Sequence, residues 1–313
     1  MKKKFLCLMM SLTAVLFIQA NSAFAAVTND NDDTSIVSYD ILNDSDVNAK
    51  QTLASKFSNE FNPNLSEDQK KELRSELGSI LAELVSQGAS EETIDKEIQK
   101  YNAHVLFQPE TNEDQVISPM SQGSDIQMNK PTIVYSATSK EWIVTGGGYW
   151  KTENWKNDVP GVWLPITGET KNIGGRDSVG ITFFNKSGTY NAKVLSSSGY
   201  LKNGRGQEIK NENPTYGNGN VGVAFEIQDY AKLADAGTAD VYYMGHNFAA
   251  QIVYDENFKN LHGNARTFYV HTWDNSSINN IQMGASGGTF GVTFSIANES
   301  KSFKIFNNAD ASF

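Results

Sequence analysis

The sequence predicts a mainly β protein: an antiparallel β-sandwich or jelly-roll-like domain over residues 131–313, preceded by a small α-helical hairpin region. From residue 131, apolar side chains recur at every second position, as in half-buried strands. About ten such segments are separated by turns rich in Asn and Gly, without a helical pattern between them. Residues 26–128 instead show helical spacing and hold 20 Asp and Glu against 7 Lys and Arg. This coincident change of charge and pattern predicts a boundary near residue 128.

The first 25 residues have the pattern of a secretory signal peptide. Lysines at 2–4 precede an apolar run over 5–18, and Ala-Phe-Ala at 23–25 precedes Ala26. We therefore expect a secreted, extracellular bacterial protein with 23 Lys and Arg against 36 Asp and Glu, a net charge of −13. The only cysteine, Cys7, lies in the signal, so no disulfide or Cys metal site is expected. Such acidity argues against nucleic acid as a partner.

Two helices are expected within a small helical region over residues 49–107. Ser66 can cap the first helix in a capping box with Gln69, and Gly88 ends it. Ser90 begins the second helix, and the short loop between them favours a helical hairpin. The apolar faces expected to pack together are Leu73, Leu77, Ile80, Leu81, Leu84 and Val85 in the first helix and Ile94, Ile98 and Tyr101 in the second.

Three further segments complete the expected organisation of the N-terminal part. Residues 26–48 are rich in Asp, Asn and Ser and predict a flexible acidic leader. A weaker helix around Ala49 to Phe61 is expected to add Leu53 and Phe57 to the small helical core. Residues 108–130 contain two prolines and no sustained period, which predicts a linker.

The strands of the C-terminal domain are predicted from their alternation. Val221, Val223, Phe225 and Ile227 share one face of a strand, and the segment 290–296 alternates in the same way. The other expected strands cover residues 133–137, 142–145, 179–184, 190–195, 241–244, 249–254, 267–273 and 303–306.

One of these strands carries candidate ligand-binding residues. Alternation places Tyr269, His271 and Trp273 on the face opposite Phe268 and Val270. If that face is exposed, its rings can stack on a sugar or an apolar ligand while the imidazole forms hydrogen bonds. The alternative, which we favour, is that both faces are buried and His271 bonds to a neighbouring strand.

A second candidate ligand-binding site is the segment that begins with Gly146–Gly148 and includes Trp150, Trp155 and Trp163. Glycine-rich backbone beside aromatic rings can form an exposed rim for a ligand. It is equally consistent with a tight turn between two strands whose indoles are core residues.

Neither a metal or cofactor site nor a catalytic residue is predicted. Asp44, Asp46 and Asn48 alternate as in a calcium loop, but the required Gly and closing Glu are missing. The four histidines lack metal-ligand spacing. Asp274 is three residues from His271 and so points to the other face of the strand, and the chain has no G-x-S-x-G motif. Whether the protein is an enzyme stays open, although a non-catalytic role is favoured.

The expected function is that of a non-catalytic extracellular or cell-surface binding protein. Its partner is expected to be a cell-wall glycan, another carbohydrate or a surface protein, with contacts from Trp150, Trp155, Trp163, Tyr269, His271 and Trp273. One alternative is a membrane-active, pore-forming-like β-protein in which a strand pair near Ile281 to Ile305 rearranges, because small polar residues alternate there with apolar ones. Another alternative is an extracellular hydrolase. The sequence leaves open the ligand, the strand order, the oligomeric state and whether residues 26–128 are a cleaved propeptide.

Overall fold

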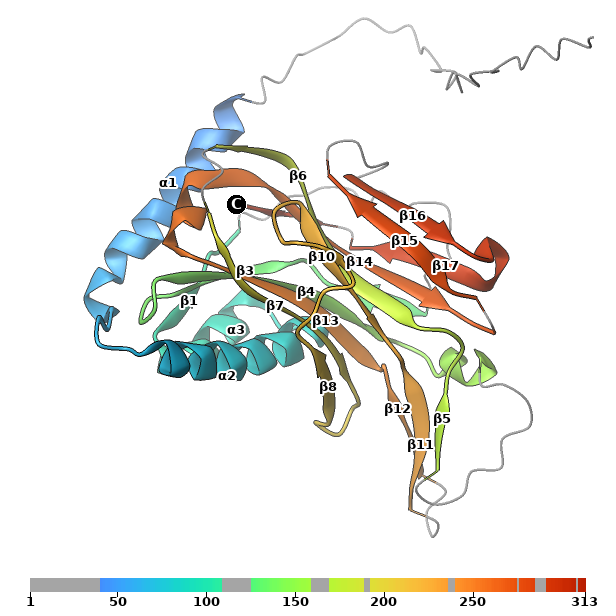
Figure 1. Ribbon diagram of the computed structural model, residues 1–313. Helices are drawn as coiled ribbons and strands as arrows, with labels where there is room; N and C mark the ends of the chain where they lie inside the picture. The colour runs from blue at the N-terminus through green and yellow to red at the C-terminus, as the bar shows by residue number, and fades with distance from the viewer. Residues whose placement is uncertain are drawn as a thin grey trace, which may run out of the picture. The chain divides into compact units, whose positions relative to one another are not determined.

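The computed structural model describes residues 40–108, 125–158, 169–188, 192–235, 240–274, 276–284, 291–307 and 309–313. Residues 39–313 form one compact unit. Antiparallel sheets make up most of this unit and a few helices accompany them (Figure 1). The prediction of a mainly β, sandwich-like fold with a small helical N-terminal region is therefore confirmed.

Two large antiparallel sheets form the sandwich. The first, in the described residues, has seven strands in the order β1-β3-β4-β13-β7-β8, with β2 also paired to β4. Their bounds are β1 (Ala103–Val105), β2 (Ile126–Met128), β3 (Thr132–Ser136), β4 (Glu141–Trp150), β7 (Val194–Lys202), β8 (Glu208–Asn211) and β13 (Asn247–Tyr254). The strands β1 and β2 come from segments in which the sequence pattern indicated no strand.

The second sheet has, in the described part of the chain, six strands in the order β17-β14-β6-β10-β9, with β18 also paired to β14. Their bounds are β6 (Asp177–Gly188), β9 (Tyr216–Gly217), β10 (Gly222–Ile227), β14 (Leu261–Thr272), β17 (Ser302–Phe306) and β18 (Ala311–Ser312). The main core lies between the two sheets: Phe248 of β13 stacks on Tyr269 of β14 with ring centroids 3.9 Å apart.

The helical hairpin covers the outer face of the seven-stranded sheet. The helices are α2 (Glu67–Ser86) and α3 (Glu91–Ile98), and the predicted capping box of Ser66 and Gln69 is present. Leu77 of α2 lies in one apolar cluster with Ile94 of α3 and Ile143 of β4. The hairpin therefore shares its core with the sheet, because two short helices alone cannot enclose an apolar face of this width.

The first helix, α1 (Asp40–Lys56), packs elsewhere than expected. Leu53 and Phe57 contact the main core between the sheets, so their assignment to the helical core was wrong. The contacts of Lys50 fix the position of α1. Its side chain is fully buried, and its Nζ donates a hydrogen bond to the Leu261 carbonyl and lies 5.2 Å from the centre of the Phe313 ring. These contacts bring α1 to the end of β14.

Two small sheets complete the fold. A three-stranded sheet has the order β12-β11-β5, formed by β5 (Thr170–Asn172), β11 (Tyr230–Asp235) and β12 (Asp240–Met244). A two-stranded sheet pairs β15 (Ile278–Met283) with β16 (Val292–Ile296). The latter packs on the outer face of the six-stranded sheet, beside β14 and β17 in Figure 1.

The three consecutive glycines lie in the middle of β4, so neither the rim nor the tight-turn interpretation is correct. They are required because neighbouring segments approach the strand closely. A Cβ at Gly146 would lie 1.8 Å from Thr267 Oγ1, and one at Gly148 would lie 2.2 Å from the Gln127 carbonyl oxygen. Both distances are far below van der Waals contact.

Candidate functional site

The aromatic residues proposed as ligand contacts are mostly inside the protein. Trp150 and Trp155 are 3% exposed, Tyr269 and His271 are fully buried, and Trp273 is half-buried. Trp163 lies outside the described residues. Both faces of β14 are covered, as in the favoured alternative, so the idea of an exposed strip is wrong for Tyr269 and His271. Whether any of these side chains contacts a ligand stays a prediction.

His271 is the centre of a buried polar network. Its Nδ1 lies 2.9 Å from both carboxylate oxygens of Asp177, which begins the neighbouring strand β6. Its Nε2 lies 3.1 Å from Asp158 Oδ2. Asp177 also accepts hydrogen bonds from the Tyr269 hydroxyl and from the Thr272 backbone N–H, the latter at 3.0 Å. Asp274, which the alternation placed on the other face of the strand, forms an ion pair with Lys301.

Asp229 extends this network toward the three-stranded sheet. The Tyr243 hydroxyl donates to Asp229 Oδ2 at 2.5 Å, and Tyr243 belongs to β12. Gln228 Nε2 donates to the carbonyl oxygens of Gly175 and Asp229, each at 3.1 Å. The network therefore connects β12 of the three-stranded sheet to the main sandwich.

The electrostatics of the network favour a protonated His271. Burial by itself lowers its pKa, but the charge of Asp177 and hydrogen bonds to Asp158 and Asp177 outweigh burial and raise the pKa to about 10. Burial and the nearby charge of Asp177 raise the pKa of Asp229 well above its usual value. Burial likewise raises the pKa of Tyr243 and of Tyr269, so both hydroxyls remain protonated donors.

The same residues have the donor set for a metal ion, but they also bind one another. One ligand atom each from Asp177, Asp229 and His271 lie within 4.8 Å of one another. Both ring nitrogens of His271, however, already face the carboxylates of Asp177 and Asp158. Asp177 and Asp229 each accept a hydrogen bond from a tyrosine hydroxyl. A protonated imidazole thus supplies the positive charge that a bound cation would otherwise supply.

Among the described residues, the network does not have the arrangement of a nucleophile and its base. In a Ser-His-Asp triad, the nitrogen opposite the orienting aspartate faces the nucleophilic hydroxyl. In this protein that nitrogen, Nε2, faces Asp158 instead. The side chain of His271 is also fully buried. These observations favour a structural role for the network.

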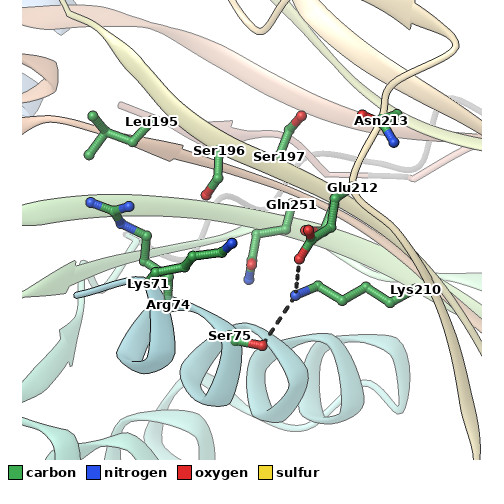
Figure 2. A pocket seen from close by; sticks show the side chains of 11 residues that line it. Lys71, Arg74, Ser75, Leu195, Ser196, Ser197, Lys210, Glu212, Asn213 and Gln251 are labelled. Carbon is green, nitrogen blue, oxygen red and sulfur yellow. Dashed lines mark hydrogen bonds and ion pairs between the residues drawn. The ribbon is translucent and has the colours of Figure 1, made fainter. Parts of the chain in front are cut away.

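An open polar cleft lies between α2 and the outer face of the seven-stranded sheet (Figure 2). Its volume is about 370 Å³, within the range of small-ligand sites. Ser196 of β7 and Gln251 of β13 point toward the helix, whereas Ser197 points away from it. The complete lining is Lys71, Arg74, Ser75, Leu195, Ser196, Ser197, Ser198, Lys210, Glu212, Asn213 and Gln251.

Ion pairs hold most of the charges in this cleft in place. Arg74 forms a bidentate pair with Glu141 at 2.6 and 2.9 Å. Lys210 lies 2.8 Å from Glu212, and this hydrogen bond lowers the pKa of the Glu212 carboxyl. Lys71 makes no hydrogen bond or ion pair with any described residue. The lining holds three cations and one carboxylate, and Glu67 and Glu141, outside the lining, both pair with Arg74.

Sequence reasoning missed both the cleft and the partners of His271. Asp177 and Asp158 are 94 and 113 residues away from His271 along the chain, so no local spacing reveals them. The one local signal for the cleft was the run Ser196-Ser197-Ser198 directly after the strand expected over 190–195, because consecutive serines are uncommon on a buried sheet face.

Comparison with family models and curated proteins does not assign the chain to a family. The chain matches no protein-family model, and no curated protein matches it significantly. Among the described residues, no helix is both long and apolar enough to cross a membrane. The function must therefore be inferred from the geometry of the chain itself.

Proposed function

We propose that the protein is a secreted, non-catalytic binding protein that holds an acidic glycan of a cell surface or cell wall in the cleft of Figure 2. The observation that carries this proposal is the cleft itself. It combines an open polar space, side-chain amides and hydroxyls on its walls, and Lys71, which forms no hydrogen bond or ion pair with a described residue and interacts with Glu212 only through its charge.

The side chains of the cleft suit the hydrogen-bonding groups of a sugar. Hydroxyl and amide side chains can donate and accept, as sugar hydroxyls do. Ser196 and Asn213 supply such groups at the wall, and the amide of Gln251 is held in place because its Nε2 donates to Thr145 Oγ1 at 2.9 Å. A fixed donor and acceptor set loses little entropy when a ligand binds.

The charge of the cleft favours an acidic sugar over a neutral one. Lys71 can pair with a carboxylate or another acidic substituent at the cost of no existing ion pair. Arg74 and Lys210 lie beside it, each partly neutralised by Glu141 or Glu212. A charge-assisted hydrogen bond is stronger than one between neutral groups. The acidic remainder of the protein would repel the same ligand elsewhere.

Two experiments test this proposal. One is sedimentation of the protein with purified cell walls, and the other is a glycan array that contains uronic-acid oligosaccharides and their neutral counterparts. Lys71→Glu reverses the unpaired charge and should weaken binding of acidic glycans about tenfold or more. Ser196→Trp places an indole in the cleft and should weaken binding of every glycan that enters it. Lys96→Glu, an identical charge change at an exposed position of α3, is the matched control and should bind as the wild type does.

Two results would contradict the proposal. One is that the wild-type protein binds neither cell walls nor any acidic glycan. The other is that Lys71→Glu and Lys96→Glu reduce binding equally, because the effect would then come from overall charge and not from the cleft.

A further inference from the structure

A second cavity lies between α1 and the turn that joins β3 to β4. Its volume is about 380 Å³, within the range of small-ligand sites. Its walls come from α1, β3 and β4 and from two short 3-10 helices, η1 (Ser58–Glu60) and η4 (Glu256–Asn260). None of the described residues that line it also lines the cleft of Figure 2, so the two are separate spaces.

Two aromatic side chains form part of the wall of this cavity. Tyr135 and Trp142 are cross-strand partners in β3 and β4, and their ring centroids are 4.8 Å apart. Trp142 is fully buried and also packs on Phe258, with ring centroids 6.1 Å apart. The core of the sandwich therefore fixes this wall. Flat apolar rings of this kind suit a ligand with a flat apolar body.

The polar hydrogens of these two side chains have no acceptor among the described residues. The Nε1 atom of Trp142 is buried without a hydrogen-bond partner. The Tyr135 hydroxyl likewise forms no hydrogen bond with a described residue. Burial and the charge of Glu256 raise the pKa of Tyr135 to about 12, so the hydroxyl keeps its proton. Because donors at buried positions are almost always paired, two such donors beside one cavity indicate a ligand with acceptor atoms.

Two lysines add positive charge to the cavity. Neither Lys140 nor Lys259 forms an ion pair or a hydrogen bond with a described residue. Nζ of Lys140 lies 4.1 Å from the centre of the Phe61 ring, a contact that positions the ammonium group and leaves its charge without a carboxylate. Glu256 is the one carboxylate among the described lining residues, and it is exposed. Two cations against one carboxylate favour a ligand with a single negative charge.

The turn that carries Lys140 is fixed by the backbone. The Asn62 N–H donates a hydrogen bond to the Thr138 carbonyl at 3.1 Å, which ties the chain after η1 to this turn. Lys140 itself has a φ of +57°, in the left-handed region that Gly and Asn occupy more readily. A wall that is formed in advance loses little entropy when a ligand binds.

We propose that this cavity is a second binding site, which takes a small carboxylic acid with a flat apolar body. The carboxylate pairs with Lys140 and Lys259 and accepts hydrogen bonds from the Tyr135 hydroxyl and the Trp142 indole. The apolar body lies along the two rings. Because the site shares no described lining residue with the cleft of Figure 2, it does not depend on glycan binding there.

The test follows the indole N–H signal of Trp142 in NMR spectra of the ¹⁵N-labelled protein, in which each of the five tryptophans gives one such signal. The probes are benzoate and its neutral counterpart benzamide, which has nearly the same shape. Benzoate should shift the Trp142 signal in a saturable manner, which gives a Kd. Benzamide should bind at least about tenfold more weakly, because it forms no charge-assisted hydrogen bond with the lysines.

Four variants locate the bound acid. Lys259→Gln should raise the Kd for benzoate about tenfold. Ser55→Phe, at an exposed position of α1 that lines the cavity, places a ring in it and should abolish the shift. Lys96→Gln, the same charge change at an exposed position of α3, is the matched control and should keep the wild-type Kd. Lys71→Glu, in the cleft of Figure 2, should keep it too.

Three results would overturn the proposal. The first is that benzoate does not shift the Trp142 signal of the wild-type protein, and the second is that benzamide binds as tightly as benzoate. The third is that Lys96→Gln or Lys71→Glu weakens binding as much as Lys259→Gln, because the acid would then respond to overall charge or bind in the other cleft. None of these results bears on the glycan array, so the two proposals fail separately.

Discussion

His271 and Asp177 form a buried ion pair between adjacent strands: Nδ1 of the imidazole lies 2.9 Å from both oxygens of the carboxylate. Neither side chain is more than 1% exposed. Removing one partner would leave the other charge buried without compensation, a loss of about 3–5 kcal/mol in comparable pairs. The pair is therefore a major determinant of how β14, β6 and the neighbouring small sheet fit together.

The first prediction is that the free energy of unfolding falls as the pH rises from 6.5 toward 10. In the folded protein His271 retains its proton up to a pKa of about 10, while in the unfolded chain the proton leaves near the ordinary value of 6.5. The stabilisation is complete below pH 6.5 and is lost through this window, with a slope of at most about 1.4 kcal/mol per pH unit. Urea unfolding at a series of pH values measures it.

The control for this prediction is His271→Gln, which has no titrating ring. The variant should be less stable than the wild type at pH 6.5, and its stability should vary much less between pH 7 and 9. The raised pKa of Asp229 also lowers the free energy of unfolding as the pH rises, but at lower pH. A carboxyl that stays protonated in the folded state stabilises the protein fully below its unfolded pKa, and this contribution is lost as the pH rises above that value. An equal pH slope in both proteins would show that His271 is not the titrating group.

The second prediction concerns the glycines of β4. Gly146→Ala should destabilise the protein by about 1–3 kcal/mol, because the new methyl group would overlap Thr267, a fully buried β-branched residue. Gly204→Ala is the matched control, since a Cβ there meets nothing within 4 Å, and it should change stability by less than about 0.5 kcal/mol. Equal melting temperatures for the two variants would contradict the packing described for β4.

The third prediction is that the helical hairpin and the sandwich unfold together. Leu77→Ala should cost about 2–5 kcal/mol and shift a single cooperative transition, because Leu77 is buried against Ile143 of the sheet. Glu76→Ala, at an exposed position of the same helix, should leave that transition in place. A lower melting point for helical signal alone, with the β signal unchanged, would show that the two regions unfold independently.

The local structure of this protein could be predicted because it depends on local interactions. The capping box needs only Ser66, Gln69 and the backbone between them, and the structure contains it. The alternation over 221–227 predicted β10 because a strand with one buried face needs apolar residues at every second position. The ends of α2, the start of α3 and the mainly β class follow from such short-range rules.

The same rules do not determine which face of a strand meets another layer. Alternation placed Tyr269 and His271 on one side of β14 and Phe268 on the other, correctly. It contains no information that β15 and β16 cover one side while β4 and β13 cover the other. The glycines of β4 show the same limit, since the residues that require them, Thr267 and Gln127, belong to distant segments.

The sequence by itself determined the secondary-structure class, the ends of α2, the start of α3, the amphipathic pattern near 290–296 and the absence of charge around it. Only the tertiary structure decided that His271 pairs with Asp177 and Asp158, and that α2 and β7 enclose a polar cleft. The physical reason is that propensity and periodicity act over a few residues. Ion pairs, clefts and covered faces arise where segments about a hundred residues apart meet, and their free energy depends on burial that exists only after the sheets have packed.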